Sequence, residues 1–206
     1  METIGVGRSG PLRLLTVVGT RPEAIKIAPI ALEAQRRPAL QHRTLASGQQ
    51  GPLFDDALEG FGLAPELRLP AVLHDRDPDI MTERLDAAIR PVLVAERPDM
   101  VLVQGDTTSA YAGARAAHAL GIPIGHVEAG LRSHDWAQPW PEERNRVMID
   151  RLATLLFAPT ADAEANLAAE HDVVVGTVVV TGNTGIDALL TMRAKLPPCH
   201  RPRTPR

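Results

Sequence analysis

Short runs of apolar residues alternate along the chain with longer segments of helical period. Most of the apolar runs are unbroken, which is typical of strands that are covered by helices on both faces. Strands that alternate with helices form βαβ units and a parallel sheet. We therefore predict an α/β fold with a doubly wound, mostly parallel sheet. The expected strands are Leu14–Val18, Met100–Gln104, Pro123–Val127, Leu155–Ala158 and Val178–Thr181, with a weaker candidate at Gln41–Ala46.

Six helices are predicted between and after these strands. They are Pro22–Arg36, Pro78–Glu96, Thr107–Leu120, Glu142–Thr154, Ala161–Glu170 and Gly185–Lys195. The Thr107–Leu120 segment is dense in alanine and glycine, and such small residues let a helix lie close against a sheet. After Leu196 the chain reads PPCHRPRTPR, and proline lacks the amide hydrogen that a helix or an interior strand needs. We divide the chain into a flexible tail (1–11), one domain (12–190) and a Pro/Arg-rich tail (191–206).

Composition narrows the function classes. A formal net charge of −3 and an aromatic content of 3% offer neither the cations nor the stacking surfaces that nucleic acid requires. The single cysteine, Cys199, cannot form an internal disulfide, and no zinc-type spacing of Cys and His occurs. No apolar run is long enough to span a membrane. We expect a cytoplasmic protein without a metal site.

Polar residues that follow the predicted strands are the candidate site residues, because ligands of doubly wound sheets bind beyond the carboxyl ends of the strands. After the first strand, Thr20 and Glu23 have the spacing of a capping box. Arg21 and Lys26 lack such an explanation, since cations in a first turn oppose the helix dipole. They either bind an anion at the helix N-terminus or are solvated surface cations. The segment is neither a GxGxxG motif nor a P-loop, so no dinucleotide or ATP site is indicated.

Two further strands are followed by acidic residues. Asp106 comes two residues after Gln104, and either Asp106 or Thr107 is a suitable N-cap for the next helix. Glu128 begins a loop directly after Val127, where no helix needs a cap. The alternative for Glu128 is a salt bridge within the loop.

The helix that begins at Glu142 completes the set. Acidic residues are favoured in a first helical turn, and Arg146 follows Glu142 by four residues, so an i,i+4 ion pair is the plain explanation. Together the candidates offer carboxylates for proton transfer and cations for an anionic ligand at one edge of one sheet. They are Asp106, Glu128, Glu142, Arg21, Lys26 and Arg146. The residues alone predict an acid/base enzyme that acts on a phosphorylated small molecule.

Five sequence blocks resemble, in order and spacing, those of non-hydrolysing bacterial UDP-N-acetylglucosamine 2-epimerases. The blocks are VVGTRPEAIKIAPI, VQGDTTSA, IGHVEAGLRS, PWPEERNR and VTGNTGIDALL, and the resemblance covers the domain from Leu12 to Leu190. It implies a Rossmann-like domain that is one half of a glycosyltransferase-B-type architecture. Members of this family usually work as homodimers without a cofactor. A second domain, which carries a catalytic histidine, is expected to be absent from this chain, so we expect the chain to be inactive alone.

The resemblance also implies a reaction and a set of residue roles. UDP-N-acetylglucosamine (UDP-GlcNAc) and its C2 epimer UDP-N-acetylmannosamine (UDP-ManNAc) interconvert when UDP is eliminated across C1–C2 and added back, in the service of polysaccharide biosynthesis. The resemblance assigns catalysis to Asp106, Glu128 and Glu142, with Asp106 and Glu128 also contacting substrate. It assigns substrate binding to Arg21 and Lys26, near the diphosphate, and to Arg146.

The chain departs from the family pattern at 47–51. Where the family generally has Gln-His-Arg after its second strand, this chain has Ser47-Gly48-Gln49-Gln50-Gly51. Two alternatives to the epimerase stay open. One is a hydrolysing epimerase or a related sugar-nucleotide transferase; hydrolysis would release free N-acetylmannosamine and UDP. The other is a non-catalytic half-protein that needs a partner chain.

Overall fold

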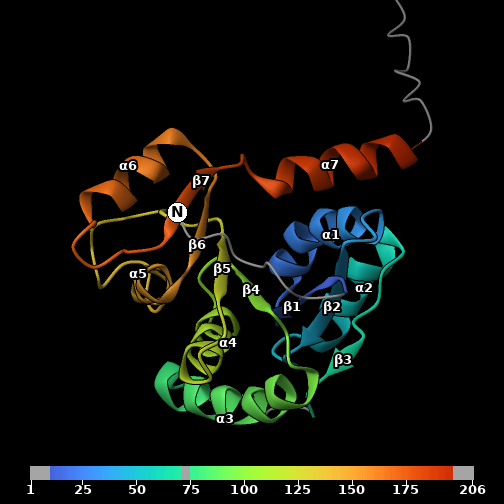
Figure 1. Ribbon diagram of the computed structural model, residues 1–206, viewed down its shortest axis with the longest axis horizontal. Helices are drawn as coiled ribbons and strands as arrows, with labels where there is room; N and C mark the ends of the chain where they lie inside the picture. The colour runs from blue at the N-terminus through green and yellow to red at the C-terminus, as the bar shows by residue number, and fades with distance from the viewer. Residues whose placement is uncertain (1–9, 71–74, 197–206) are drawn as a thin grey trace, which may run out of the picture.

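The computed structural model describes residues 10–70 and 75–196. In these residues seven parallel strands form one sheet in the order β3-β2-β1-β4-β5-β6-β7 (Figure 1). The order reverses between β1 and β4, so the prediction of a doubly wound, Rossmann-like sheet is confirmed. The strands are β1 (Leu12–Val18), β2 (Leu40–Ala46), β3 (Leu67–Arg68), β4 (Met100–Gln104), β5 (Ile124–Val127), β6 (Leu155–Ala158) and β7 (Thr177–Val180).

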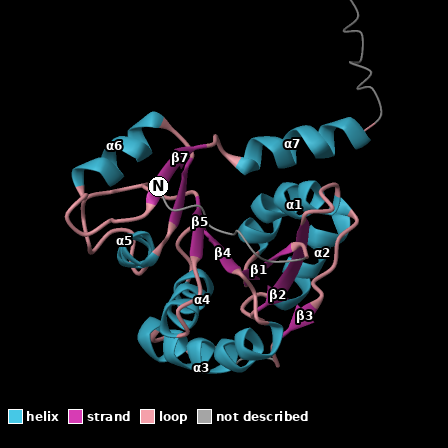
Figure 2. Cartoon of the chain, viewed as in Figure 1, coloured by secondary structure: helices cyan, strands magenta, loops and turns pink. Residues whose placement is uncertain are grey.

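Helices cover both faces of this sheet (Figure 2). On one face α3, α4 and α5 pack side by side, and on the other α1 packs between α2 and α7. The helices are α1 (Arg21–Gln35), α2 (Gly51–Phe61), α3 (Pro78–Glu96), α4 (Thr108–Ala119), α5 (Glu142–Leu152), α6 (Ala161–Ala169) and α7 (Thr184–Lys195). In the described ranges, no helix has the length and apolar character to cross a membrane.

The apolar pattern predicts most of these elements closely. Strands β4 and β6 and helix α3 have the predicted bounds, and the other predicted elements differ by one or two residues at one or both ends. Helix α2 and the two-residue strand β3 were not predicted. The first 9 residues of the predicted N-terminal tail and residues 197–206 of the C-terminal tail lie outside the described residues.

Small residues bring α4 close to the centre of the sheet, as the sequence predicts. A Cβ at Gly113 would lie only 3.0 Å from the Cβ of Val17 on β1. Five alanines of α4 are fully buried on the same helix: Ala110, Ala112, Ala114, Ala116 and Ala117. The start of α4, which follows the Asp106 loop, is therefore held firmly against β1 and β4.

A second close approach lies at the reversal point of the sheet. A Cβ at Gly19, just after β1, would lie 2.1 Å from Ser109 Oγ and 2.3 Å from Ser47 Oγ. These two serines are fully buried, and their hydroxyl oxygens are 2.7 Å apart in a hydrogen bond. The absence of a side chain at Gly19 thus lets the ends of β1 and β2 meet the start of α4.

This packing predicts opposite effects for two Gly→Ala substitutions. Gly19→Ala should destabilise the fold by about 1–3 kcal/mol, because the methyl group overpacks the buried serine pair. Gly60→Ala is the matched control: Gly60 lies inside α2, and its nearest neighbour is the flexible Met192 Cε at 3.8 Å. Alanine there should stabilise α2 by up to about 1 kcal/mol. Urea unfolding, monitored by circular dichroism, measures the stability change of each variant. A Gly19→Ala chain as stable as the parent would contradict the packing argument.

Candidate functional site

The six candidate residues follow the carboxyl ends of neighbouring strands, as predicted. Arg21 and Lys26 lie in α1 after β1, Asp106 follows β4, and Glu128 follows β5. Glu142 and Arg146 lie in α5, which returns to the same edge after the loop from β5.

Asp106 and Arg146 form the first pair. Arg146 Nη2 lies 2.6 Å from Asp106 Oδ2, and Arg146 Nη1 lies 3.5 Å from Glu143 Oε2. The predicted i,i+4 pair between Arg146 and Glu142 is not among the ion pairs of the described residues. Arg146 instead reaches across to the loop after β4, which places a guanidinium group directly on a candidate catalytic carboxylate.

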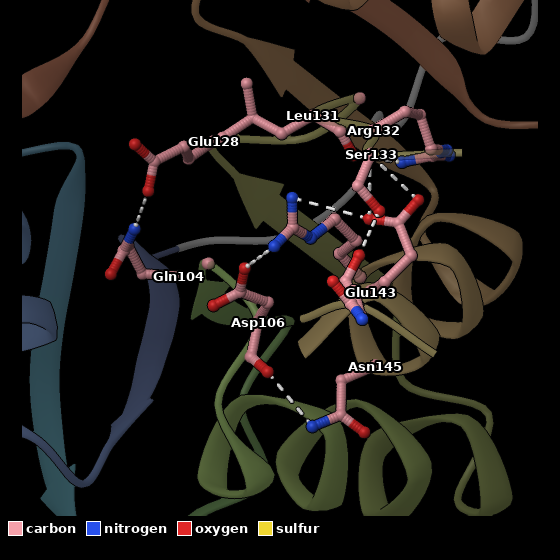
Figure 3. Close-up of polar contacts among 12 residues, drawn as sticks. Gln104, Asp106, Glu128, Leu131, Arg132, Ser133, Glu143 and Asn145 are labelled. Carbon is pink, nitrogen blue, oxygen red and sulfur yellow. Dashed lines mark hydrogen bonds and ion pairs between the residues drawn. The ribbon is translucent and has the colours of Figure 1, made fainter. Parts of the chain in front are cut away.

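The Asp106 side chain is not a helix cap. Thr107 is the N-cap of α4, and its Oγ1 accepts a hydrogen bond from Ala110 N at 3.0 Å. This settles the alternative between Asp106 and Thr107. The main-chain oxygen of Asp106 accepts a hydrogen bond from Asn145 Nδ2 at 3.0 Å (Figure 3). Helix α5 therefore holds Asp106 by its backbone and by its side chain.

The surroundings of Asp106 favour its protonated form. Burial raises the pKa of Asp106 above its ordinary value, Arg146 lowers it, and the neighbouring carboxylates of Glu142 and Glu128 raise it again. The net result is a raised pKa. A carboxyl group that holds a proton more readily than usual, at the edge of a cavity, is suited to general acid/base chemistry.

Glu128 is held by three side chains from three elements. Its Oε2 accepts from Lys26 Nζ and from Gln104 Nε2, each at 2.5 Å, and its Oε1 accepts from Asn183 Nδ2 at 3.0 Å. Figure 3 shows Gln104 pointing at this carboxylate. Glu128 does form a salt bridge, but its partner is Lys26 on α1 and not a residue of the loop, as the sequence alternative had it. Lys26, left open between anion binding and solvation, is the cation of that bridge.

Arg21 lies apart from this group. It is exposed, and its main-chain N donates to Gln50 Oε1 at 2.9 Å. The residue lines a cavity of about 470 Å³ between α1, α2 and α7, together with Ile25 and Phe61. The structure does not bring Arg21 together with the carboxylates of the other candidates.

A second cavity, of about 360 Å³, lies beside Asp106 and Glu142. Its walls come from the loops after β1, β2 and β4, from residues 75–81 at the start of α3, and from the start of α5. Gln49 and Gln50 form part of the wall, so the departure from the family pattern at 47–51 lies in this cavity. Ser109 Oγ donates to Gln49 Oε1 at 2.6 Å, which fixes that side chain in the wall.

Sequence reasoning gave Glu23 only a capping role, and the structure gives it more. Glu23 is 1% exposed, and its Oε2 accepts from Gly19 N at 3.0 Å and from Thr20 N at 2.7 Å. Its Oε1 accepts from Thr107 Oγ1 at 2.7 Å, which links the loops after β1 and β4. Burial raises the pKa of Glu23, although all of these hydrogen bonds lower it.

Three amide side chains were missed: Gln104, Asn145 and Asn183. Each belongs to one of the recognised sequence blocks, and each donates to a candidate catalytic residue. Asn183 is also the N-cap of α7, where its Oδ1 accepts from Gly185 N at 2.8 Å. Two of them could have been found from their positions in the sequence, because Gln104 ends a predicted strand and Asn183 precedes a predicted helix. Their partners could not be read from spacing.

Comparisons with known proteins agree on one family. A sequence profile described as UDP-N-acetylglucosamine 2-epimerase matches residues 32–203. The UDP-N-acetylglucosamine 2-epimerase of Escherichia coli K12 is 40% identical over 182 residues, which are 88% of this chain and 48% of that protein. The chain thus spans about half the length of the curated relatives that it matches.

Solved structures give the same result. The Neisseria meningitidis UDP-GlcNAc 2-epimerase bound to UDP-GlcNAc is 39% identical, with a TM-score of 0.84 over 89% of this chain and 49% of that chain. The Methanocaldococcus jannaschii UDP-GlcNAc 2-epimerase in complex with UDP-GlcNAc and UDP is 36% identical, with a TM-score of 0.77 over 87% and 49%. The matched half is one domain of a glycosyltransferase-B-type architecture.

The raised pKa of Asp106 predicts that its ionised form opposes folding. This cost is absent below the ordinary Asp pKa of 3.8 and complete above the folded-state value. Asp106→Asn should therefore raise the melting temperature at pH 7, and the gain should shrink towards pH 3.8. Thermal unfolding over this pH range tests it, with Asp56→Asn, an exposed aspartate of α2, as the control. A lower melting temperature for Asp106→Asn at pH 7 would show that the Arg146 pair outweighs burial.

Proposed function

The chain belongs to the UDP-N-acetylglucosamine 2-epimerase family, and we propose that it forms the acid/base side of an active site that interconverts UDP-GlcNAc and UDP-ManNAc. One observation carries the proposal. Asp106, with its raised pKa, lies at a cavity with an arginine on its carboxylate and with Glu128 and Glu142 close enough to raise that pKa. Such a group of carboxyls is what proton transfer at a sugar carbon requires.

The proposed reaction needs two proton-handling groups. A base removes the proton from C2, the freed electron pair forms the C1–C2 double bond, and the C1–O bond breaks with its electrons going to UDP. Re-addition of UDP to C1 is coupled to delivery of a proton to the opposite face of C2. Asp106, Glu128 and Glu142 are the carboxyls that we propose for these two transfers and for orienting the sugar. Groups at different points around the cavity suit a reaction that uses both faces of one carbon.

Cations at this edge support the departure of UDP. Negative charge grows on the diphosphate as the C1–O bond breaks, and a fixed cation nearby stabilises that charge. Arg146 is 14% exposed and Lys26 is 30% exposed at the side chain, so both remain accessible beside the carboxylates. We propose that bound diphosphate shares Lys26 with Glu128. Gln104 and Asn183 would keep the Glu128 carboxylate in place while Lys26 contacts the diphosphate.

The first test replaces each proposed catalytic carboxyl by its amide. The assay uses a hybrid enzyme, in which residues 1–196 of this chain are joined to the second half of the Escherichia coli relative. Asp106→Asn, Glu128→Gln and Glu142→Gln should each lower kcat by about 10²–10⁴-fold, because each removes a group that transfers or orients a proton. Glu164→Gln, an exposed glutamate of α6, is the control.

Products and isotope incorporation decide the outcome. Proton NMR in heavy water should show UDP-ManNAc formed with solvent deuterium at C2. Free N-acetylmannosamine together with UDP would instead indicate a hydrolysing enzyme. Turnover near that of the parent hybrid in all three amide variants would refute the residue assignment while leaving the family intact.

A second prediction concerns the 206-residue chain alone. The chain matches about half of each relative, so we propose that turnover needs the other half of that fold. The chain alone should therefore incorporate no deuterium at C2 of UDP-GlcNAc above the rate without protein, whereas the hybrid should incorporate it catalytically. Equal molar amounts of chain and hybrid provide the comparison. Enzyme-like turnover by the chain alone would contradict the proposal.

A further inference from the structure

A buried group of charged side chains lies beneath the candidate carboxylates and plays no part in the reaction proposed above. Its centre is His126 on β5, whose side chain is 0% exposed. His126 Nδ1 is 2.6 Å from Asp150 Oδ1, and His126 Nε2 is 2.8 Å from the carbonyl oxygen of Gly105. A carbonyl oxygen can only accept, and a carboxylate can only accept. Both ring nitrogens thus face acceptors, and a ring with a hydrogen on each nitrogen would satisfy both contacts.

Asp150, on α5, is the ionised partner. Burial alone would raise its pKa, but the charges and hydrogen bonds of His126 and Arg132 lower the pKa of Asp150 below its ordinary value. Its Oδ2 accepts from Arg132 Nη1 at 2.7 Å and from Gly130 N at 3.2 Å. The Arg132 side chain is 1% exposed. It also donates to Glu170, from Nε to Oε1 at 2.7 Å and from Nη2 to Oε2 at 3.0 Å. The buried Arg132 guanidinium thus lies between the carboxylates of Asp150 and Glu170, and His126 contacts the far side of Asp150.

This group joins the chain segments that carry the three candidate carboxylates. Gly105 directly precedes Asp106, His126 lies two residues before Glu128, and Gly130 lies two residues after it. Asp150 lies on α5, one helical turn after Arg146 and two turns after Glu142. A single hydrogen-bonded pair, His126–Asp150, therefore contacts the Asp106 loop, the Glu128 strand and loop, and the Glu142 helix.

The contact at Gly105 is the most sensitive point of this arrangement. Gly105 has φ of +67°, and glycine adopts many backbone conformations at similar energy because it has no Cβ. Its backbone alone therefore does little to fix the direction of its carbonyl group. The hydrogen bond from His126 supplies that direction. A Cβ at Gly105 would lie 3.7 Å from Glu128 Oε2, so a small rotation here would change the spacing between the Asp106 loop and the Glu128 carboxylate.

We propose that His126 and Asp150 are positioning residues, which set the separation of Asp106, Glu128 and Glu142 without touching the substrate. The kinetic part of this inference rests on the proposed function, whereas its structural part does not. A purely structural role would lower stability and leave the chemistry of the folded protein unchanged. A positioning role changes the titration of Asp106 and the turnover of the folded enzyme.

The first experiment uses the unaltered 206-residue chain. Nitrogen-15 NMR of the imidazole rings at pH 7 should show two protonated nitrogens for His126. His42 is the internal control: its Nε2 is hydrogen-bonded to Thr16 Oγ1 at 2.7 Å, and burial lowers the pKa of His42, so it should be neutral with one N–H. A neutral His126 ring with a single N–H would overturn the proposal, and this result does not depend on whether any variant folds.

The second experiment follows Asp106 by carboxyl carbon-13 NMR in the same chain. His126→Gln removes a positive charge that lowers the pKa of Asp106, so Asp106 should titrate at higher pH than in the parent. His42→Gln, the same substitution on β2, should leave the titration unchanged. An unchanged Asp106 titration in folded His126→Gln would overturn the proposal, and the nitrogen-15 measurement on the unaltered chain decides it if that variant does not fold.

The third experiment measures kinetics in the hybrid enzyme. His126→Ala should lower kcat by about 10–100-fold per folded site and change KM far less, a loss of the size seen when an outer hydrogen-bond partner that orients a metal ligand is removed. His126→Gln should recover part of kcat, because its amide can still donate to the Gly105 carbonyl. Lower melting temperatures with unchanged kcat would show a purely structural role. If the parent hybrid makes no UDP-ManNAc, the proposed function fails, and the Asp106 titration still decides the positioning role.

Discussion

A carboxylate that leaves water must find donors inside the protein, and this requirement organises the carboxyl edge of the sheet. Ionised groups lose several kcal/mol of hydration on burial unless neighbouring charges and hydrogen bonds replace it. Glu128 finds its donors on α1, β4 and the start of α7, and Asp106 finds its donor on α5. Each bond joins segments that are distant in sequence. The ends of the strands are therefore fixed relative to one another by the same charges that the proposed chemistry uses.

The fold could be predicted from the sequence because parallel strands and their covering helices have strong apolar periodicity. Helix α2 was missed since Gly51 and Pro52 suggest a turn, although proline is favoured in a first helical turn. Its buried side chains, Phe54, Leu58 and Phe61, do have helical spacing. Strand β3 has only two residues, too few to show any period.

The candidate site was predicted in its location but not in its pairing. Local spacing suggested Glu142 as the partner of Arg146, yet Asp106 is the partner because the order of strands brings its loop to α5. For Glu128 the sequence offered only a salt bridge within its loop, and the structure gives it three partners from other parts of the chain. Spacing rules describe one helix at a time, whereas these pairs depend on which strand ends are neighbours. Glu23 shows the same limit: its bond to Thr107 spans two loops that meet only in the folded sheet.

Glu128 has φ of +70°, a left-handed conformation that costs a residue with a side chain about 1–2 kcal/mol and costs glycine little. Glycine at this position would relax the backbone, but it would also remove the carboxylate that Lys26, Gln104 and Asn183 converge on. Backbone strain and the proposed chemistry therefore oppose each other at a single residue. A descendant of this chain released from selection for that chemistry would relieve the backbone strain with glycine or asparagine there. The residue at this position would therefore show whether a lineage has kept the carboxylate that the proposed reaction needs.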